Sequence, residues 1–94
     1  MKSIIQTNKK CIECGSVFNL HLHHILFGKN RAKADEDGLV VWLCYEHHEG
    51  TNGVHGKNGH NLDMKLKILA EQKWCEYYHK TPQDFLSRYY KNYL

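Results

Sequence analysis

The residues best able to do chemistry lie between Cys11 and His55. Cys11 and Cys14 form a Cys-x-x-Cys motif, and Cys44 and His47 form a Cys-x-x-His motif thirty residues later. Zinc in structural sites is held by four cysteine or histidine side chains in a tetrahedron, and a two-residue gap lets each pair bind the ion from one turn. The spacing therefore predicts a structural Zn²⁺ bound by these four residues.

Two other interpretations of the cysteines compete with a zinc site. Cys44 could be a small buried apolar residue that follows the apolar residues 39–43 and packs with them. Cys11 and Cys14 could be a redox pair, but such a pair needs a βαβ context, and none surrounds Cys11. Cys75 has no neighbour at ligand spacing, so we expect it to pack in the core.

The histidines left after the zinc motif predict a second, more open centre. His23 and His24 are adjacent in an extended segment, so their side chains point to different faces, and one can bind a metal while the other reaches a substrate. His48 directly follows the predicted zinc ligand His47, so zinc would fix where His48 points. His55 lies in a glycine-flanked loop and could complete the ligand set.

Structural explanations for these histidines remain open. His23 could be a strand residue bonded to a backbone carbonyl, and His48 could be a solvent-facing helix residue. The remaining histidines are expected at the surface: His21, His60 and His79.

Composition favours one small globular domain in the cytoplasm. The chain has 94 residues, is 41% hydrophobic and 24% charged, and carries a net charge of +3, which permits but does not require nucleic-acid binding. Its first residues lack the apolar stretch of a signal peptide. Its longest apolar run, residues 39–44, is too short to span a membrane, so we expect no membrane partner and reduced cysteines.

The hydrophobic pattern predicts an α+β fold with a hairpin followed by two helices. Residues 17–26 and 39–43 are predicted strands, and the polar, glycine-bounded residues 28–38 a loop. Apolar residues spaced by three and four predict a helix from Asn61, its N-cap, onward. Thr81 and Pro82 are typical of the start of a second helix.

Basic and aromatic residues suggest contacts outside the metal centres. Lys29, Arg31 and Lys33 in the predicted loop suit phosphate contacts, although they could equally be solvated and balanced by the acidic residues 35–37. The C-terminal tyrosines, residues 89–93, could stack on bases. Packing of the helices, or a homodimer contact through them, explains these tyrosines better.

Three motifs together resemble the HNH branch of the His-Me finger nucleases, most closely the small bacteriophage and prophage type. They are Cys-x-x-Cys-Gly at residue 11, His-His-Ile at residue 23 and Leu-Cys-x-x-His-His at residue 43. A basic turn at residues 28–33, a strand at 38–44 and Gly-Val-His at 53–55 extend the similarity. It covers about residues 11–80.

The resemblance implies a ββα-metal core with a zinc knuckle that hydrolyses phosphodiester bonds in DNA, in a bacterial cytoplasm. It implies that His24 is the general base and that His23 and His48 bind one divalent ion. Arg31 would be a substrate contact. A ligand set rich in histidine favours Mn²⁺, Ni²⁺, Co²⁺ or Zn²⁺ over Mg²⁺.

The chain departs from the family at the asparagine that orients the base. This residue should fall near residues 37–39, where Asp37, Gly38 and Leu39 stand. Asp37 is therefore a candidate to orient His24. An alternative hypothesis is a catalytically inactive, zinc-stapled module that binds DNA or a protein. In either case we expect a single domain at 1–94, with a core at about 11–60 and a helical extension at about 61–94.

Overall fold

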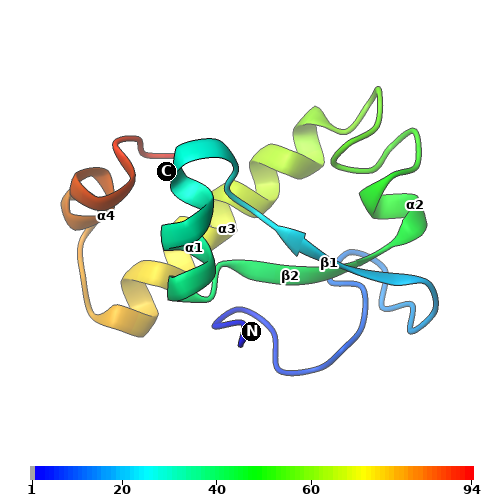
Figure 1. Ribbon diagram of the computed structural model, residues 1–94, viewed down its shortest axis with the longest axis horizontal. Helices are drawn as coiled ribbons and strands as arrows, with labels where there is room; N and C mark the ends of the chain where they lie inside the picture. Colours follow the sequence, from blue (N-terminus) through cyan, green and yellow to red (C-terminus); the bar gives the residue numbers. More distant parts are fainter. Residues whose placement is uncertain (1) are drawn as a thin grey trace.

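The computed structural model describes residues 2–94 and has a small, compact α+β fold (Figure 1). The described residues form two strands, one short 3₁₀ helix and four α-helices. In order, the elements are β1 (Leu20–His24), η1 (Gly28–Asn30), α1 (Arg31–Asp37), β2 (Val40–Cys44), α2 (Tyr45–His48), α3 (His60–Tyr78) and α4 (Pro82–Tyr89).

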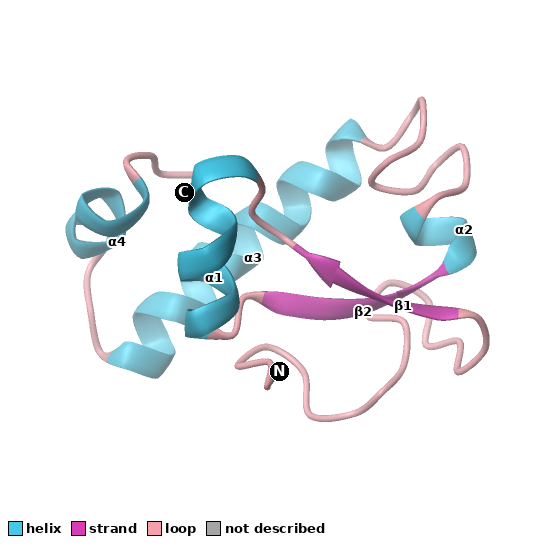
Figure 2. Cartoon of the chain, viewed as in Figure 1, coloured by secondary structure: helices cyan, strands magenta, loops and turns pink. Residues whose placement is uncertain are grey.

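Strands β1 and β2 form a two-stranded antiparallel sheet at the centre of the molecule (Figure 2). Leu20 pairs with Cys44 and His24 with Val40, so the hairpin carries His23, His24 and Cys44, one or more residues of each predicted centre. In the view of Figure 1, α1 lies in front of α3, beside the end of the hairpin where β1 ends and β2 begins. The hydrophobic core contains apolar residues of β2, α3 and α4, among them Val41, Leu43, Leu66, Ala70, Trp74 and Phe85, and Leu20 of β1 packs against it.

The N-terminal segment bonds to β2 along the edge that β1 leaves open. The Oε1 atom of Gln6 accepts a hydrogen bond from the Trp42 backbone at 2.6 Å, and the Ile12 N–H donates to the Trp42 carbonyl at 2.9 Å. At the start of β2, Gly38 has φ +82°, and a Cβ there would lie 2.7 Å from the Lys2 carbonyl. Glycine is therefore required for the close approach of this segment.

The prediction of a loop over residues 28–38 is wrong, because η1 and α1 occupy it. Residues 31–37 include no glycine or proline, so nothing in them breaks a helix. Arg31 and Asp35 are four residues apart, the spacing of a helical ion pair, with Nε and Oδ2 3.7 Å apart. Ala34 is buried, and Gly38 ends the helix in the left-handed conformation. Of the charged residues of this helix, Arg31 and Glu36 are exposed, whereas Asp37 is buried.

The other predicted elements are present with shifted ends. Strand β1 is shorter than residues 17–26, since Val17 and Phe18 are exposed before it. Helix α3 begins at His60 with Gly59 as its N-cap, so the prediction of Asn61 as the cap is wrong. The predicted start of α4 is confirmed: Thr81 makes a capping box with Asp84, and Pro82 is the first helical residue.

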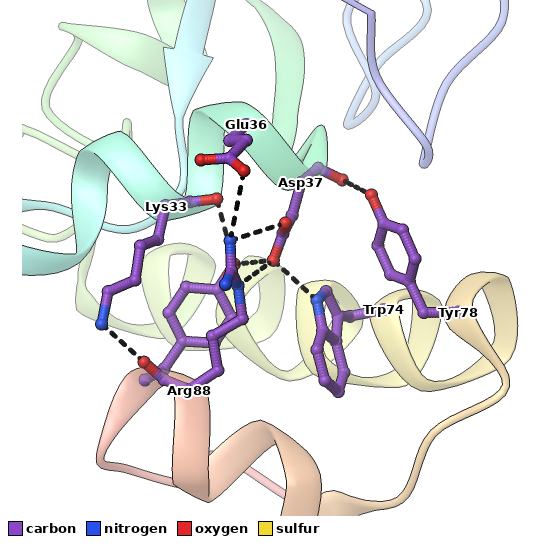
Figure 3. Close-up of polar contacts among 7 residues, drawn as sticks. Lys33, Glu36, Asp37, Trp74, Tyr78 and Arg88 are labelled. Atoms are coloured by element: carbon purple, nitrogen blue, oxygen red, sulfur yellow. Dashed lines mark hydrogen bonds and ion pairs between the residues drawn. The ribbon is translucent and has the colours of Figure 1, made fainter.

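A buried carboxylate joins the C-terminal helices to α1 (Figure 3). Asp37 accepts hydrogen bonds from Arg88 Nε at 2.6 Å, from Arg88 Nη2 at 2.9 Å and from Trp74 Nε1 at 2.8 Å. The Tyr89 hydroxyl also donates to it, and the Tyr78 hydroxyl donates to its backbone carbonyl at 2.8 Å. Burial and the adjacent carboxylate raise the pKa of Tyr89. Packing within the chain thus accounts for Tyr89, while a homodimer stays a prediction.

None of the helices formed by residues 2–94 combines the length and the apolar character needed to cross a membrane.

Candidate functional site

Three cysteines and one histidine form a cluster that can hold a metal ion such as zinc. Ligand atoms of Cys11, Cys14, Cys44 and His47 all lie within 4.8 Å of one another. The sulfurs of Cys14 and Cys44 are 3.8 Å apart, and Nδ1 of His47 lies 3.2 Å from the Cys44 sulfur and 3.7 Å from that of Cys11. With Zn–S bonds of about 2.3 Å, a tetrahedron separates neighbouring sulfurs by about 3.8 Å. The observed separations therefore suit one tetrahedral ion.

Local backbone structure prepares the cysteines for this role. The Cys11 N–H donates to the Ser16 carbonyl, and the Gly15 N–H donates to the Cys11 carbonyl, each at 2.8 Å. Gly15 has φ +79°, which glycine adopts without strain. Burial raises the pKa of the Cys11 thiol, but hydrogen bonds with the backbone of Cys44, Cys14 and Glu13 outweigh burial and lower it to about 7. The low pKa favours the thiolate, which is the form that binds metal.

Three imidazoles form a second cluster beside the first. Ligand atoms of His23, His48 and His55 lie within 4.8 Å of one another. The ring centroids are 5.3 Å apart for His23 and His48, 5.5 Å for His23 and His55, and 4.7 Å for His48 and His55. His23 is 1% exposed, and its Nε2 atom is buried without a hydrogen-bond partner. A buried polar atom without a partner is costly, and a bound cation would satisfy it.

The loop after α2 brings His55 to this cluster. The Val54 and His55 N–H groups donate to the carbonyls of His47 and His48 at 2.9 and 3.0 Å. This pairing requires Gly53, where a Cβ would lie 2.7 Å from the Glu46 carbonyl oxygen. The same short helix therefore carries a candidate ligand of each cluster, His47 and His48, and the loop folds back on both.

Burial keeps two of the three imidazoles neutral. Burial, together with the neighbouring rings of His48 and His55, lowers the pKa of His23 to about 3. Burial and the His55 ring also lower the pKa of His48. Neutral imidazole is the form that binds a metal, so proton competition for these two ligands is weak at neutral pH.

His24 lies at the end of β1 and pairs with a carboxylate from α1. Its Nδ1 atom is 2.7 Å from Oδ1 of Asp35, and both side chains are about one-fifth to one-quarter exposed. The hypothesis that Asp37 orients His24 is wrong, because Asp37 points away to Arg88, Trp74 and Tyr89. The two carboxylates lie two residues apart on α1, so they project from different sides of the helix.

Both adjacent histidines of β1 open on one cavity with the imidazole cluster. The cavity has a volume of about 260 Å³, and its wall contains a basic side chain from α1. The lining residues are Leu22, His23, His24, Phe27, Gly28, Arg31, His48 and His55. The structure thus brings the predicted base, the predicted metal ligands and one predicted substrate contact to the same site.

The other two predicted phosphate contacts do not line this cavity. Lys29 is exposed in η1. The Nζ atom of Lys33 donates to the Arg88 carbonyl at 2.7 Å and lies 4.6 Å from the centre of the Tyr90 ring. Lys33 is therefore directed to the C-terminal helix and not to the imidazoles, and its contact with substrate stays a prediction.

Sequence reasoning missed two residues at the site. The charge pattern predicts that Asp35 lies in an acidic loop, although its spacing from Arg31 is that of a helical ion pair. The prediction that His21 lies at the surface is wrong, because it is half-buried, with Nδ1 2.8 Å from Nδ1 of His48. Strand alternation carried the signal, since His21 and His23 share one face of β1. His60 and His79 are exposed as predicted.

No family model matches this chain, and neither a curated protein nor a solved structure shows significant similarity to it.

Proposed function

We propose that this protein is a metal-dependent endonuclease of the HNH type that hydrolyses phosphodiester bonds in DNA. One observation carries the proposal: His23, His24 and His48 open on a single cavity, with the orphaned Nε2 of His23 among the imidazoles. A structural module has no need of a carboxylate-paired histidine beside a cluster of neutral imidazoles. The similarity of the three sequence motifs to phage and prophage HNH nucleases supports the same function.

His24 is the general base in this proposal. Its Nδ1–H donates to Asp35, which leaves the lone pair of Nε2 free to take a proton from a water molecule. The carboxylate fixes the orientation of the ring and stabilises the imidazolium that forms. Asp35 thereby fills the orienting role that an asparagine has in the HNH family.

His23, His48 and His55 would hold the catalytic divalent ion. Bound there, the ion would supply electrostatic stabilisation of the negative charge that develops on the phosphate and the leaving oxygen. Imidazole ligands favour Mn²⁺, Co²⁺, Ni²⁺ or Zn²⁺ over Mg²⁺. Burial of His23 and His48 keeps both rings neutral for this purpose.

The cysteine centre and Arg31 would support catalysis without carrying out the chemical step. The cysteine centre would hold a structural Zn²⁺ that fixes α2, and with it the direction of His48. Arg31, on the wall of the cavity and 58% exposed, would contact a phosphate of the DNA backbone.

A catalytically inactive binding module is the second candidate. The absence of the family's middle asparagine favours it, since Asp37, Gly38 and Leu39 occupy that region. Such a module would keep the zinc centre and bind DNA or a protein through the same surface.

Supercoiled plasmid distinguishes the two functions. The zinc-loaded protein is incubated with plasmid and Mg²⁺, Mn²⁺, Co²⁺ or Ni²⁺, and a gel-shift assay is run in parallel with EDTA-treated DNA. We expect a nuclease to convert supercoiled plasmid to nicked or linear DNA, faster with Mn²⁺, Co²⁺ or Ni²⁺ than with Mg²⁺. A shift of DNA mobility with intact plasmid under every metal would support the binding module and overturn the nuclease.

A further inference from the structure

His21 and His48 are joined by a direct contact between ring nitrogens. Their Nδ1 atoms are 2.8 Å apart, and the two rings meet edge to face with an interplanar angle of 87°. His21 lies on β1, on the same face as His23, while His48 ends α2. Both side chains are half-buried. The contact therefore links the strand to the helix beside the imidazole centre.

This contact leaves only one nitrogen of His48 for a metal. A neutral imidazole has one N–H and one lone pair on its two nitrogens. With Nδ1 engaged by His21, Nε2 is the nitrogen of His48 that remains, and its ring lies against those of His23 and His55. A metal-binding histidine usually donates its other N–H to a partner that fixes the ring and raises its basicity.

We propose that His21 is a positioning residue for the metal centre. It accepts the Nδ1–H of His48 and so holds the His48 ring with Nε2 directed to the divalent ion. The inference rests on the proposed metal centre of His23, His48 and His55. It predicts that His21 contributes to metal affinity without touching the metal.

A shared ion between His21 and His48 is a weaker explanation of the contact. Glu49 is close enough to be a third ligand, with Oε1 3.3 Å from Nδ1 of His48. In the tetrahedral geometry of Zn²⁺, two nitrogens bound at about 2.0–2.1 Å lie about 3.3–3.4 Å apart. The observed 2.8 Å between Nδ1 atoms is the length of a hydrogen bond.

Glu49 is also the competing acceptor for the same N–H. The Glu49 Oε1 atom lies 3.3 Å from His48 Nδ1, whereas Nδ1 of His21 lies 2.8 Å from the same atom. The Glu49 side chain is 45% exposed, so water competes for its carboxylate. His21 is the shorter and less hydrated partner.

The test measures Co²⁺ binding to protein that already holds one equivalent of Zn²⁺. Cobalt d–d absorption reports binding at the imidazole centre, and the absence of a sulfur-to-cobalt band shows that zinc keeps the cysteines. The variants are His21→Leu, which fills the same space without an acceptor, His21→Gln, which supplies an amide oxygen, and Glu49→Ala. His60→Ala is the control, since His60 is exposed at the start of α3.

We expect His21→Leu to weaken Co²⁺ affinity 10- to 100-fold and His21→Gln to recover part of the loss. Glu49→Ala and His60→Ala should change affinity less than about threefold, with zinc content unchanged in all variants. Equal affinity of wild type and His21→Leu would overturn the proposal, as would a larger loss in Glu49→Ala. If wild type binds Co²⁺ and His21→Leu weakens that binding, but the protein does not cleave plasmid, the proposed nuclease activity is refuted and the positioning role of His21 stands.

Discussion

His24 and Asp35 form the closest histidine–carboxylate pair of the site, with Nδ1 and Oδ1 2.7 Å apart. The pair joins the end of β1 to the middle of α1. Because the contact engages Nδ1, Nε2 is the nitrogen left to act as the proposed base. The orientation of His24 thus depends on a helix that lies between the two strands in the sequence.

Asp35→Asn should lower the rate of plasmid nicking about 10- to 100-fold at saturating Mn²⁺. The amide keeps the shape of the side chain but gives less support to the imidazolium. Glu36→Gln is the matched control, since Glu36 is 77% exposed on the same helix. Equal nicking rates for Asp35→Asn and wild type would show that this pair does not orient the base.

Cys44→Ser should unfold the domain, because it removes one of four ligands from a centre that ties the N-terminal segment to β2 and α2. Cys75→Ser is the control, since Cys75 lies in α3 outside the cluster. Circular dichroism and zinc content check both variants. A folded, zinc-free Cys44→Ser protein would contradict a structural role for the metal.

Acidification should destabilise the protein through His23. The pKa of His23 is about 3 in the folded protein and 6.5 ordinarily. Between these values the unfolded chain binds a proton that the folded protein does not, so the free energy of unfolding falls as pH drops below 6.5. The slope from this group is at most about 1.4 kcal/mol per pH unit.

His23→Gln removes this contribution. Urea unfolding of protein with one equivalent of zinc, at pH 7.5 and at pH 5, gives the pH dependence for each form. We expect wild type to lose more stability than the variant over this interval. Parallel losses would mean that His23 is not held neutral by its surroundings.

Arg88→Met should destabilise the protein by about 2–4 kcal/mol, because it leaves the buried Asp37 carboxylate without its cation. The measurement is the free energy of unfolding in urea. Glu36→Gln again serves as control, since its carboxylate is 4.0 Å from Arg88 and exposed. A change below about 0.5 kcal/mol in Arg88→Met would show that the other hydrogen bonds of Asp37 suffice.

Local spacing explains which parts of the site the sequence predicted. Cys11 and Cys14, like Cys44 and His47, are each separated by two residues, so one turn brings each pair together whatever the rest of the fold. The two strands of the hairpin are predicted from residues 17–26, which include His23 and His24, and from the apolar residues 39–43, which precede Cys44. His23 and His24 have different neighbours, His48 and His55 for the first and Asp35 for the second, although both line one cavity.

The partners that come from other elements could not be predicted in the same way. Asp35 reaches His24 only because residues 31–37 form a helix, and their charge resembles that of a loop. Asp37 is buried only because Trp74, Arg88 and Tyr89 converge on it from α3 and α4. These are tertiary contacts across 37–52 residues, which periodicity does not report.

The most direct test of the account is the single-turnover cleavage of plasmid by wild type and His24→Ala at saturating Mn²⁺. We predict a loss of at least about 100-fold in His24→Ala, because a general base contributes about 10²–10⁴ in rate. Mn²⁺ affinity, zinc content and melting temperature should be nearly unchanged, since His24 is not a ligand of either centre. Cleavage by His24→Ala at the wild-type rate would contradict the account.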